Sequence, residues 1–287
     1  MINVLLYSNC AGRVIATMFK RHIYTKDKFT INYIVNYQNV LDNKQLDLLH
    51  KQMLENCDIF MYQPFNKHYT HSEYDISNLI KYLKPSCIIL KLNYYRFKGF
   101  WFESEYKPYE SYNNYHFSDM KYYGLHNSFI NFNGDKKDIV DKIDSIHIDR
   151  EKFLTYFRDE LDNLKKIDDN SDVKMYDYFI NNYKTKQLFN DVFHPTNLFL
   201  YEVFRQVVFK LTGHDLIFED MDFINKCNDM EMTHFALPIL PSIKQLLDIA
   251  TPDVICVFNQ GNRIYMNIYD YYYIRLSQTN FQNYLNE

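Results

Sequence analysis

Short apolar runs alternate with amphipathic segments along the first third of the chain. Four runs predict buried strands, at residues 4–7, 29–36, 58–62 and 87–92. Between them, apolar side chains recur at helical spacing in residues 14–19, 44–55 and 74–83. Strands joined by helical crossovers pair in parallel. The pattern therefore predicts an α/β fold with a doubly wound parallel sheet flanked by helices.

The rest of the chain divides into an aromatic stretch, a helical region and a short β segment. Residues 93–133 are rich in Tyr, Phe and Asn without a clear period, which favours a functional loop or lid. Pro195 is predicted to open a helix that Gly213 closes. A hairpin around Gly261 is predicted over residues 254–268. Further helices are expected at residues 135–143, 149–166, 173–183, 195–211, within 237–249, and at 269–285.

The chain shows no internal repeat and no low-complexity linker. We therefore expect one α/β catalytic domain over residues 1–250. A helical and aromatic insertion is expected at about 93–185 within this domain. Residues 251–287 are expected to pack on the domain as a C-terminal hairpin and helix.

Composition and charge narrow the classes of function. Hydrophobic residues make up 47% and charged residues 24%, as in ordinary globular proteins. The net charge of −4 comes without a basic stripe, so no nucleic-acid partner is expected. The five cysteines are odd in number and form no CxxC pair. That spacing disfavours a zinc knuckle or a disulfide framework and favours a reducing compartment.

The sequence also bears on location and metals. No apolar run approaches the ~20 residues of a membrane helix, and the chain begins with a strand rather than a cationic leader. We therefore expect a cytoplasmic protein without a membrane span. The spacings of His68, His71, His116 and His126 match no zinc pattern, so we expect surface histidines and no metal.

The turn after the first predicted strand, Ser8-Asn9-Cys10-Ala11-Gly12, is the first candidate site. In a parallel sheet this turn lies at the carboxyl edge, where ligands bind. The start of the following helix favours thiolates and phosphates, so Cys10 is a candidate nucleophile. The alternative is that Cys10 is a small packing residue in a tight turn.

Asp191 and His194 form a second candidate constellation, with Pro195 directly after them. A carboxylate three residues before an imidazole can hold one ring nitrogen and orient the ring as a general base. The alternative is that His194 only caps the helix. Gln63, just after the third predicted strand, could donate to an oxyanion or merely cap a helix.

Three cations lie near the predicted cleft: Arg13, Arg96 and Lys98. Arg96 and Lys98 could bind the phosphates of a nucleotide-like donor. The alternative is a solvated loop.

The order of these residues resembles that of the SGNH hydrolases. Cys10 stands where those enzymes carry a serine, Gln63 where they carry an oxyanion-hole Asn, and Asp191 with His194 in the late Asp-x-x-His block. A closer resemblance is to the WcbI-type polysaccharide-biosynthesis family, an SGNH-like branch associated with coenzyme A and capsule acetylation. It covers roughly residues 1–250 and is carried by Asn9-Cys10, Tyr95-Arg96-Phe97-Lys98-Gly99-Phe100, His194-Pro195 and Leu237-Pro238-Ile239-Leu240-Pro241-Ser242. Where the family has Gly-Asn-Cys-Gln, this chain has Ser8-Asn9-Cys10-Ala11.

The resemblance implies an acyltransferase that moves an acetyl group from acetyl-coenzyme A to an amine or hydroxyl of a sugar or nucleotide sugar. Two alternatives stay open: an SGNH-type esterase or deacetylase of acetylated glycans, and a non-catalytic binding module. The sequence leaves the oligomeric state open. The implied roles are catalysis for Cys10, His194 and Asp191, oxyanion or substrate binding for Asn9 and Gln63, and coenzyme A binding for Ser8, Arg13, Arg96 and Lys98.

Overall fold

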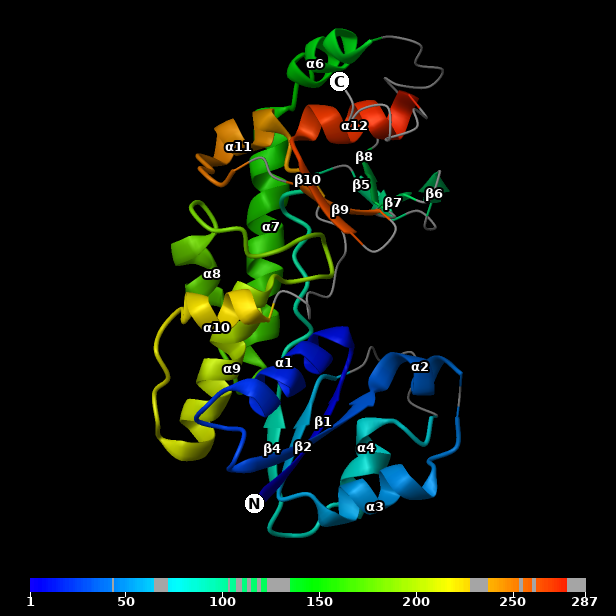
Figure 1. Ribbon diagram of the computed structural model, residues 1–287, viewed down its shortest axis with the longest axis vertical. Helices are drawn as coiled ribbons and strands as arrows, with labels where there is room; N and C mark the ends of the chain where they lie inside the picture. Colours follow the sequence, from blue (N-terminus) through cyan, green and yellow to red (C-terminus); the bar gives the residue numbers. More distant parts are fainter. Residues whose placement is uncertain are drawn as a thin grey trace. The chain divides into compact units, whose positions relative to one another are not determined.

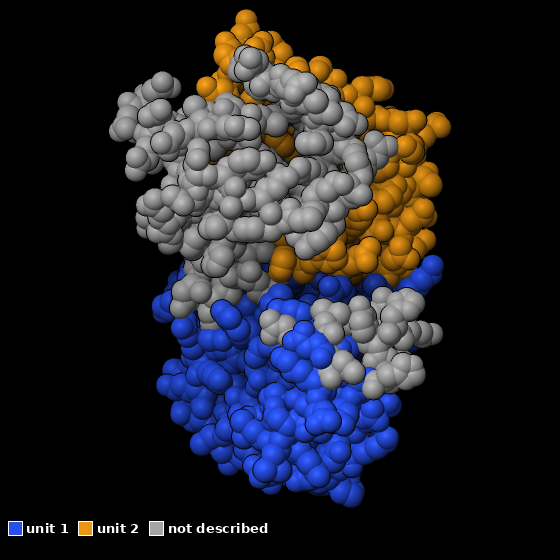
Figure 2. Space-filling view, turned by 90° about the vertical axis from the view of Figure 1, so that its right-hand side faces the viewer, with its two compact units in different colours: residues 1–95, 165–178, 195–232 blue, residues 96–164, 179–194, 233–287 orange. Residues whose placement is uncertain are grey.

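The chain folds into two compact units whose segments alternate along the sequence. The first contains residues 1–95, 165–178 and 195–232, and the second contains residues 96–164, 179–194 and 233–287 (Figure 2). The computed structural model describes residues 1–42, 44–64, 72–102, 104–106, 110–112, 115–117, 120–122, 135–227, 237–252, 255–259 and 262–277.

The first unit is built on a four-stranded parallel sheet in the order β2-β1-β3-β4 (Figure 1). The four predicted strands and their parallel pairing are confirmed. Leu5 of β1 stands beside Asn32 of β2 and Phe60 of β3 in the register. The strands are β1 (Ile2–Ser8), β2 (Phe29–Val35), β3 (Ile59–Tyr62) and β4 (Ile88–Lys91).

Helices flank this sheet, and the three helices predicted between the strands are confirmed. The third is short because its last turn, Ile80–Tyr82, tightens into a 3₁₀ helix. Two six-residue helices, at Asn36–Leu41 and Met221–Lys226, are too short to show a helical period and were not predicted. The helices are α1 (Cys10–Arg21), α2 (Asn36–Leu41), α3 (Leu48–Asn56), α4 (Ile76–Leu79), α9 (Asn197–Thr212) and α10 (Met221–Lys226).

Both faces of the sheet are covered. On one face, Leu5 and Tyr7 of β1 pack in a buried cluster with Leu54 of α3 and Leu79 of α4. The other side carries α1, which packs against α9 (Figure 1). There Phe19 of α1 meets the rings of Phe29 and Phe204 edge to face, at centroid distances of 5.5 and 5.0 Å.

The second unit combines helices with short antiparallel strands. Its four-stranded sheet has the order β10-β9-β7-β6, and β5 pairs with β8. The helices α7 and α8 have residues in both units. The elements are β5 (Ser104–Tyr106), β6 (Glu110–Tyr112), β7 (Tyr115–Phe117), β8 (Met120–Tyr122), α6 (Lys136–Asp144), α7 (Arg150–Asp169), α8 (Tyr176–Asn182), α11 (Pro241–Leu247), β9 (Ile255–Asn259), β10 (Asn262–Met266) and α12 (Ile268–Ser277).

An aromatic cluster forms the core of the second unit. The ring of Phe97 lies 4.4 Å from Phe179, 4.9 Å from Phe100 and 5.8 Å from Phe157, measured between centroids. A Cβ on Gly99 would lie 2.4 Å from the Phe97 ring, so this position requires glycine. The aromatic residues of this cluster therefore serve packing.

Two expectations change in the structure. The stretch 93–133 was predicted to be an irregular functional loop or lid, but its described residues include four strands of three residues each. Aromatic residues favour strands, and such short strands show no period. The role as a functional loop or lid stays a prediction. Pro195 does not open α9. The side chain of Thr196 accepts the Phe199 N–H as N-cap, and Asn197 is the first helical residue. Threonine is a better N-cap than proline because its hydroxyl satisfies an end N–H.

The remaining predictions for the second half hold where the structure describes them. Gly213 ends α9 with φ of +69°. The hairpin is confirmed as β9 and β10, while its turn at residues 260–261 lies outside the described residues. The last helix is confirmed as α12, and residues 278–287 also lie outside. The predicted catalytic domain 1–250 with an appendage at 251–287 stays a prediction. Within the described residues, the helices are all too short or too polar to span a membrane.

Replacing Phe19 tests the contact between α1 and α9. Phe19 is fully buried, so Phe19→Ala should lower the free energy of unfolding by about 3–5 kcal/mol. The matched control is Phe209→Ala on α9, because Phe209 is 52% exposed and its loss should cost about 0.5 kcal/mol or less. Urea unfolding followed by circular dichroism measures both. Equal effects would contradict this packing.

Candidate functional site

The turn between β1 and α1 places a thiol at the start of a helix. Asn9 is the N-cap of α1, and its Oδ1 accepts the Ala11 N–H at 3.0 Å. Cys10 is the first helical residue, and its side chain is partly exposed. A Cβ on Gly12 would lie 2.4 Å from the Ser8 Cβ, so only glycine lets α1 begin this close to the strand.

Gln63, directly after β3, connects the ends of three strands. Its side chain is buried, and its Oε1 accepts the Ser8 hydroxyl at 2.6 Å and the Asn9 N–H at 3.0 Å. Its Nε2 donates to the Asn93 carbonyl, beyond the end of β4, at 2.6 Å. The amide therefore positions the turn that carries Cys10. The predicted oxyanion role of Gln63 stays a prediction.

Other polar groups at this edge of the sheet were missed by sequence reasoning. Asn36 follows β2 and Asn93 follows β4, and both are buried. The Oδ1 of Asn36 and both side-chain polar atoms of Asn93 make no hydrogen bond with the described residues. Buried polar atoms without a protein partner are expected to meet water or ligand. Their only signal in the sequence is that each directly or closely follows a strand.

Tyr33 is a further missed neighbour of the turn. Its hydroxyl donates to the Asn9 carbonyl at 2.7 Å. Burial is the main cause that raises the pKa of Tyr33 well above its usual value; the nearby Cys10 adds to the rise and Arg13 opposes it. Arg13 is exposed and one helical turn beyond Cys10. The phenol therefore stays a neutral donor beside the thiol and this cation.

In the second unit, Asp191 holds His194. The Asp191 carboxylate is buried; its Oδ1 accepts the N–H of Phe193 at 2.8 Å and the N–H of His194 at 3.0 Å. The imidazole Nδ1 lies 2.7 Å from Asp191 Oδ2, and the His194 side chain is 30% exposed. In a catalytic triad, the imidazole of the general base is held through Nδ1 by a carboxylate and exchanges protons through Nε2. The predicted pairing of this carboxylate and imidazole is therefore present.

The segment Arg96–Lys98 runs beside this pair. The Phe97 N–H donates to the Val192 carbonyl at 3.0 Å, and the Arg96 guanidinium lies 5.9 Å above the ring of Phe193. Arg96 is exposed. The backbone of Lys98 is bound on both sides, by the Glu160 carboxylate at 3.3 Å and the Tyr156 hydroxyl at 3.2 Å.

The predicted site residues thus form two clusters, one within each unit. The first unit holds Ser8, Asn9, Cys10, Arg13 and Gln63, and the second holds Arg96, Lys98, Asp191 and His194. The meeting of the Cys10 thiol and the His194 imidazole in one crevice stays a prediction.

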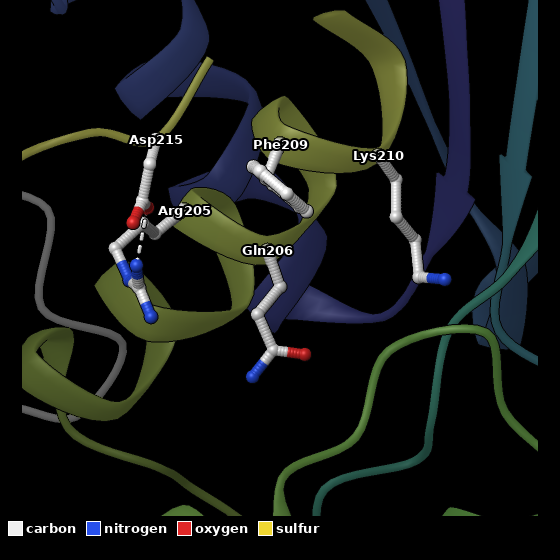
Figure 3. Close-up of a pocket in the computed structure, with 5 residues that line it drawn as sticks. All are labelled: Arg205, Gln206, Phe209, Lys210 and Asp215. Atoms are coloured by element: carbon white, nitrogen blue, oxygen red, sulfur yellow. Dashed lines mark hydrogen bonds and ion pairs between the residues drawn. The ribbon is translucent and has the colours of Figure 1, made fainter. Parts of the chain in front are cut away.

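A separate hollow of about 310 Å³ lies on α9 and is lined by Arg205, Gln206, Phe209, Lys210 and Asp215 (Figure 3). Its polar groups are largely engaged. Arg205 pairs with Glu202 and Asp215, and the Gln206 amide exchanges two hydrogen bonds with the backbone of Lys174.

Comparison with known proteins identifies the chain's relatives. The family model described as polysaccharide biosynthesis enzyme WcbI matches residues 3–214. The chain belongs to the WcbI family. A solved structure of WcbI aligns with a TM-score of 0.70 and 15% identity, over 96% of this chain and 89% of that one. It is described as a novel polysaccharide biosynthesis enzyme, in its native form without a disulfide bond between coenzyme A and a cysteine. No curated protein matched the sequence.

The match confirms the α/β fold of the WcbI family, with its parallel four-stranded sheet flanked by helices. Membership of a polysaccharide biosynthesis family implies a sugar-related substrate. Among the described residues, no three His, Cys, Asp or Glu side chains gather as metal ligands. The expectation that no metal takes part stays a prediction.

Gln63→Leu tests the connection between the strand ends. The Ser8 hydroxyl, the Asn9 N–H and the Asn93 carbonyl each lose their partner, so unfolding free energy should fall by about 3 kcal/mol or more. Gln45→Leu is the control, because Gln45 is exposed and its replacement should change stability by about 0.5 kcal/mol at most. Chemical denaturation measures both. A stability of Gln63→Leu equal to that of the control would show that the amide is not needed.

Proposed function

We propose that the chain is a cytoplasmic acyltransferase of polysaccharide biosynthesis, which moves an acetyl group from acetyl-coenzyme A to a hydroxyl or amine of a sugar or nucleotide sugar. The observation that carries the proposal is the imidazole of His194, held through Nδ1 by a buried carboxylate at 2.7 Å. Such a pair can act as the general base that takes the proton from a nucleophile or from an acceptor.

In the covalent route, Cys10 is the nucleophile. His194 takes the proton of the thiol, and the sulfur attacks the thioester carbonyl of acetyl-coenzyme A. The thioester bond to coenzyme A breaks, its sulfur leaves with the proton from His194, and acetyl-Cys10 forms. The acceptor hydroxyl or amine then gives its proton to His194 and attacks acetyl-Cys10. The Cys10 sulfur leaves and regains the proton. In the direct route, His194 deprotonates the acceptor and Cys10 only lines the site.

The oxyanion donors follow from the bonds already made at the turn. The Ala11 N–H is used by the Asn9 Oδ1, and the Gly12 N–H by the Asn9 carbonyl at 3.0 Å. We therefore assign the oxyanion to the Cys10 N–H and the Asn9 side-chain amide, with the second N–H of Gln63 beside them. One such donor is worth about 10²–10³ in rate.

Coenzyme A carries phosphates, and the cations of both clusters suit them. Arg13 and Arg96 are exposed, and neither forms an ion pair with the described residues. The solved WcbI is described as native protein without a disulfide bond between coenzyme A and a cysteine, a description that names the two together. We carry this relation to Cys10, so that the thiol of coenzyme A would come within reach of the Cys10 sulfur. Lys98 and Ser8 complete the proposed donor site.

An SGNH-type esterase or deacetylase remains the second candidate, because the Asp191–His194 pair would activate water as well as an acceptor. A hydrolase has no use for coenzyme A. Thermal unfolding with and without coenzyme A separates the two, since a ligand raises apparent stability by mass action. A rise in midpoint temperature with coenzyme A supports the transferase, and no rise supports the hydrolase. A non-catalytic module would turn over no acyl donor at all.

His194→Gln tests the proposed base. Acetyl transfer should fall by about 10²–10⁴ in kcat, because the proton acceptor is lost. The control is His214→Gln, since His214 stacks on Tyr24 at 3.9 Å outside the proposed site. Release of free coenzyme A thiol gives the rate. Wild-type turnover by His194→Gln would place the base elsewhere.

Cys10→Ala distinguishes the two routes. In the covalent route, turnover should fall by orders of magnitude, and mass spectrometry of the wild type with acetyl-coenzyme A should show one acetyl group on Cys10. Cys87→Ala is the control, because Cys87 is partly exposed and precedes β4. Full activity of Cys10→Ala together with no adduct would leave only the direct route.

A further inference from the structure

A second hollow, of about 230 Å³, lies between α3 and the sheet of the first unit. It is on the face that otherwise carries the apolar cluster of Leu5 and Tyr7. Since side chains of a strand alternate between faces, Asn3 lies on the same face as Leu5 and Tyr7. Asn32 stands beside Leu5 in the register. The hollow is lined by Asn3, Asn32, Leu49, Gln52, Met53, Asn56 and Cys57.

The lining is uncharged and rich in carboxamides. Four of its side chains are amides, from Asn3, Asn32, Gln52 and Asn56, and none is acidic or basic. The side chains of Asn3 and Asn32 make no hydrogen bond with the described residues. A carboxamide both donates and accepts, as a sugar hydroxyl does. An anion would find no cation in this lining, so the chemistry favours a neutral polyhydroxylated ligand.

The size and the apolar surface of the hollow also favour a neutral sugar. The volume lies below the ~300–1,000 Å³ of pockets for drug-sized ligands, so it suits one sugar ring rather than a nucleotide. Leu49, 59% exposed, and Met53 offer apolar contact to the C–H face of such a ring. The two amides on the sheet are left for its hydroxyls.

We propose that this hollow binds one uncharged sugar residue of an oligosaccharide or polysaccharide. Asn3 is near the amino end of β1, whereas Cys10 follows its carboxyl end, which separates them by roughly 20 Å at ~3.3 Å per residue. The hollow is therefore an accessory site, distinct from the proposed acyl-transfer site. It would hold a glycan chain on the enzyme, and it does not rest on acetyl transfer.

Ligand-observed NMR tests the proposal with methyl glycosides of glucose, galactose, mannose and N-acetylglucosamine. We expect saturation transfer from the full chain to at least one of them, with a Kd in the millimolar range, about −4 kcal/mol. Glucuronic acid should bind about tenfold more weakly, because the lining offers no cation.

Asn32→Leu should weaken binding of the same glycoside about tenfold, through loss of its hydrogen bonds. Gln52→Leu, a change on a helix surface, should also weaken binding and covers the case in which Asn32→Leu does not fold. Asn225→Leu, at an exposed position on α10, is the control and should bind as the wild type does. Absence of saturation transfer from all four glycosides at about 50 mM, well above such a Kd, would overturn the proposal. So would binding that neither lining variant weakens.

Discussion

The carboxyl edge of the sheet depends on the hydrogen bonds of the Gln63 carboxamide. A buried amide is tolerated only when its polar atoms are hydrogen-bonded. Gln63 meets this demand with the ends of β1 and β4, through Ser8, Asn9 and Asn93. Its own backbone N–H donates to the Tyr7 carbonyl at 2.9 Å. The turn that presents Cys10 is therefore fixed by strands distant in sequence.

A carboxylate has the corresponding role in the second unit. Asp191 accepts the backbone N–H groups of Phe193 and His194 as well as the imidazole nitrogen. One side chain thus sets both the path of the chain and the orientation of the ring. The chain leaves this turn to start α9, where Thr196 supplies the cap. Thr196, and not His194, therefore caps α9, and the His194 imidazole is held by Asp191.

The sequence predicted what depends on local pattern. The four strands and their parallel pairing follow from continuous apolar runs joined by helical segments, and the Asp191–His194 pair follows from a spacing of three residues. Asn36, Asn93 and Tyr33 were missed because single polar residues near strand ends look like ordinary loop or edge residues. Their importance comes from neighbours brought together by the sheet. The helix start predicted at Pro195 was wrong because the hydroxyl of the adjacent Thr196 accepts an N–H of the first helical turn, which proline cannot do.

The cysteines of the first unit differ in burial and in their surroundings. Cys57 and Cys87 lie 3.7 Å apart between their sulfur atoms, and burial raises the pKa of Cys57 to about 12. At neutral pH such a thiol is protonated and a poor nucleophile. Cys10 differs in its surroundings, because it opens a helix whose next two N–H groups already bond to Asn9. The Cys10 N–H is thus the first N–H of the helix that bonds to neither the side chain nor the carbonyl of Asn9. Negative charge that develops beside the Cys10 sulfur would be stabilised by this N–H.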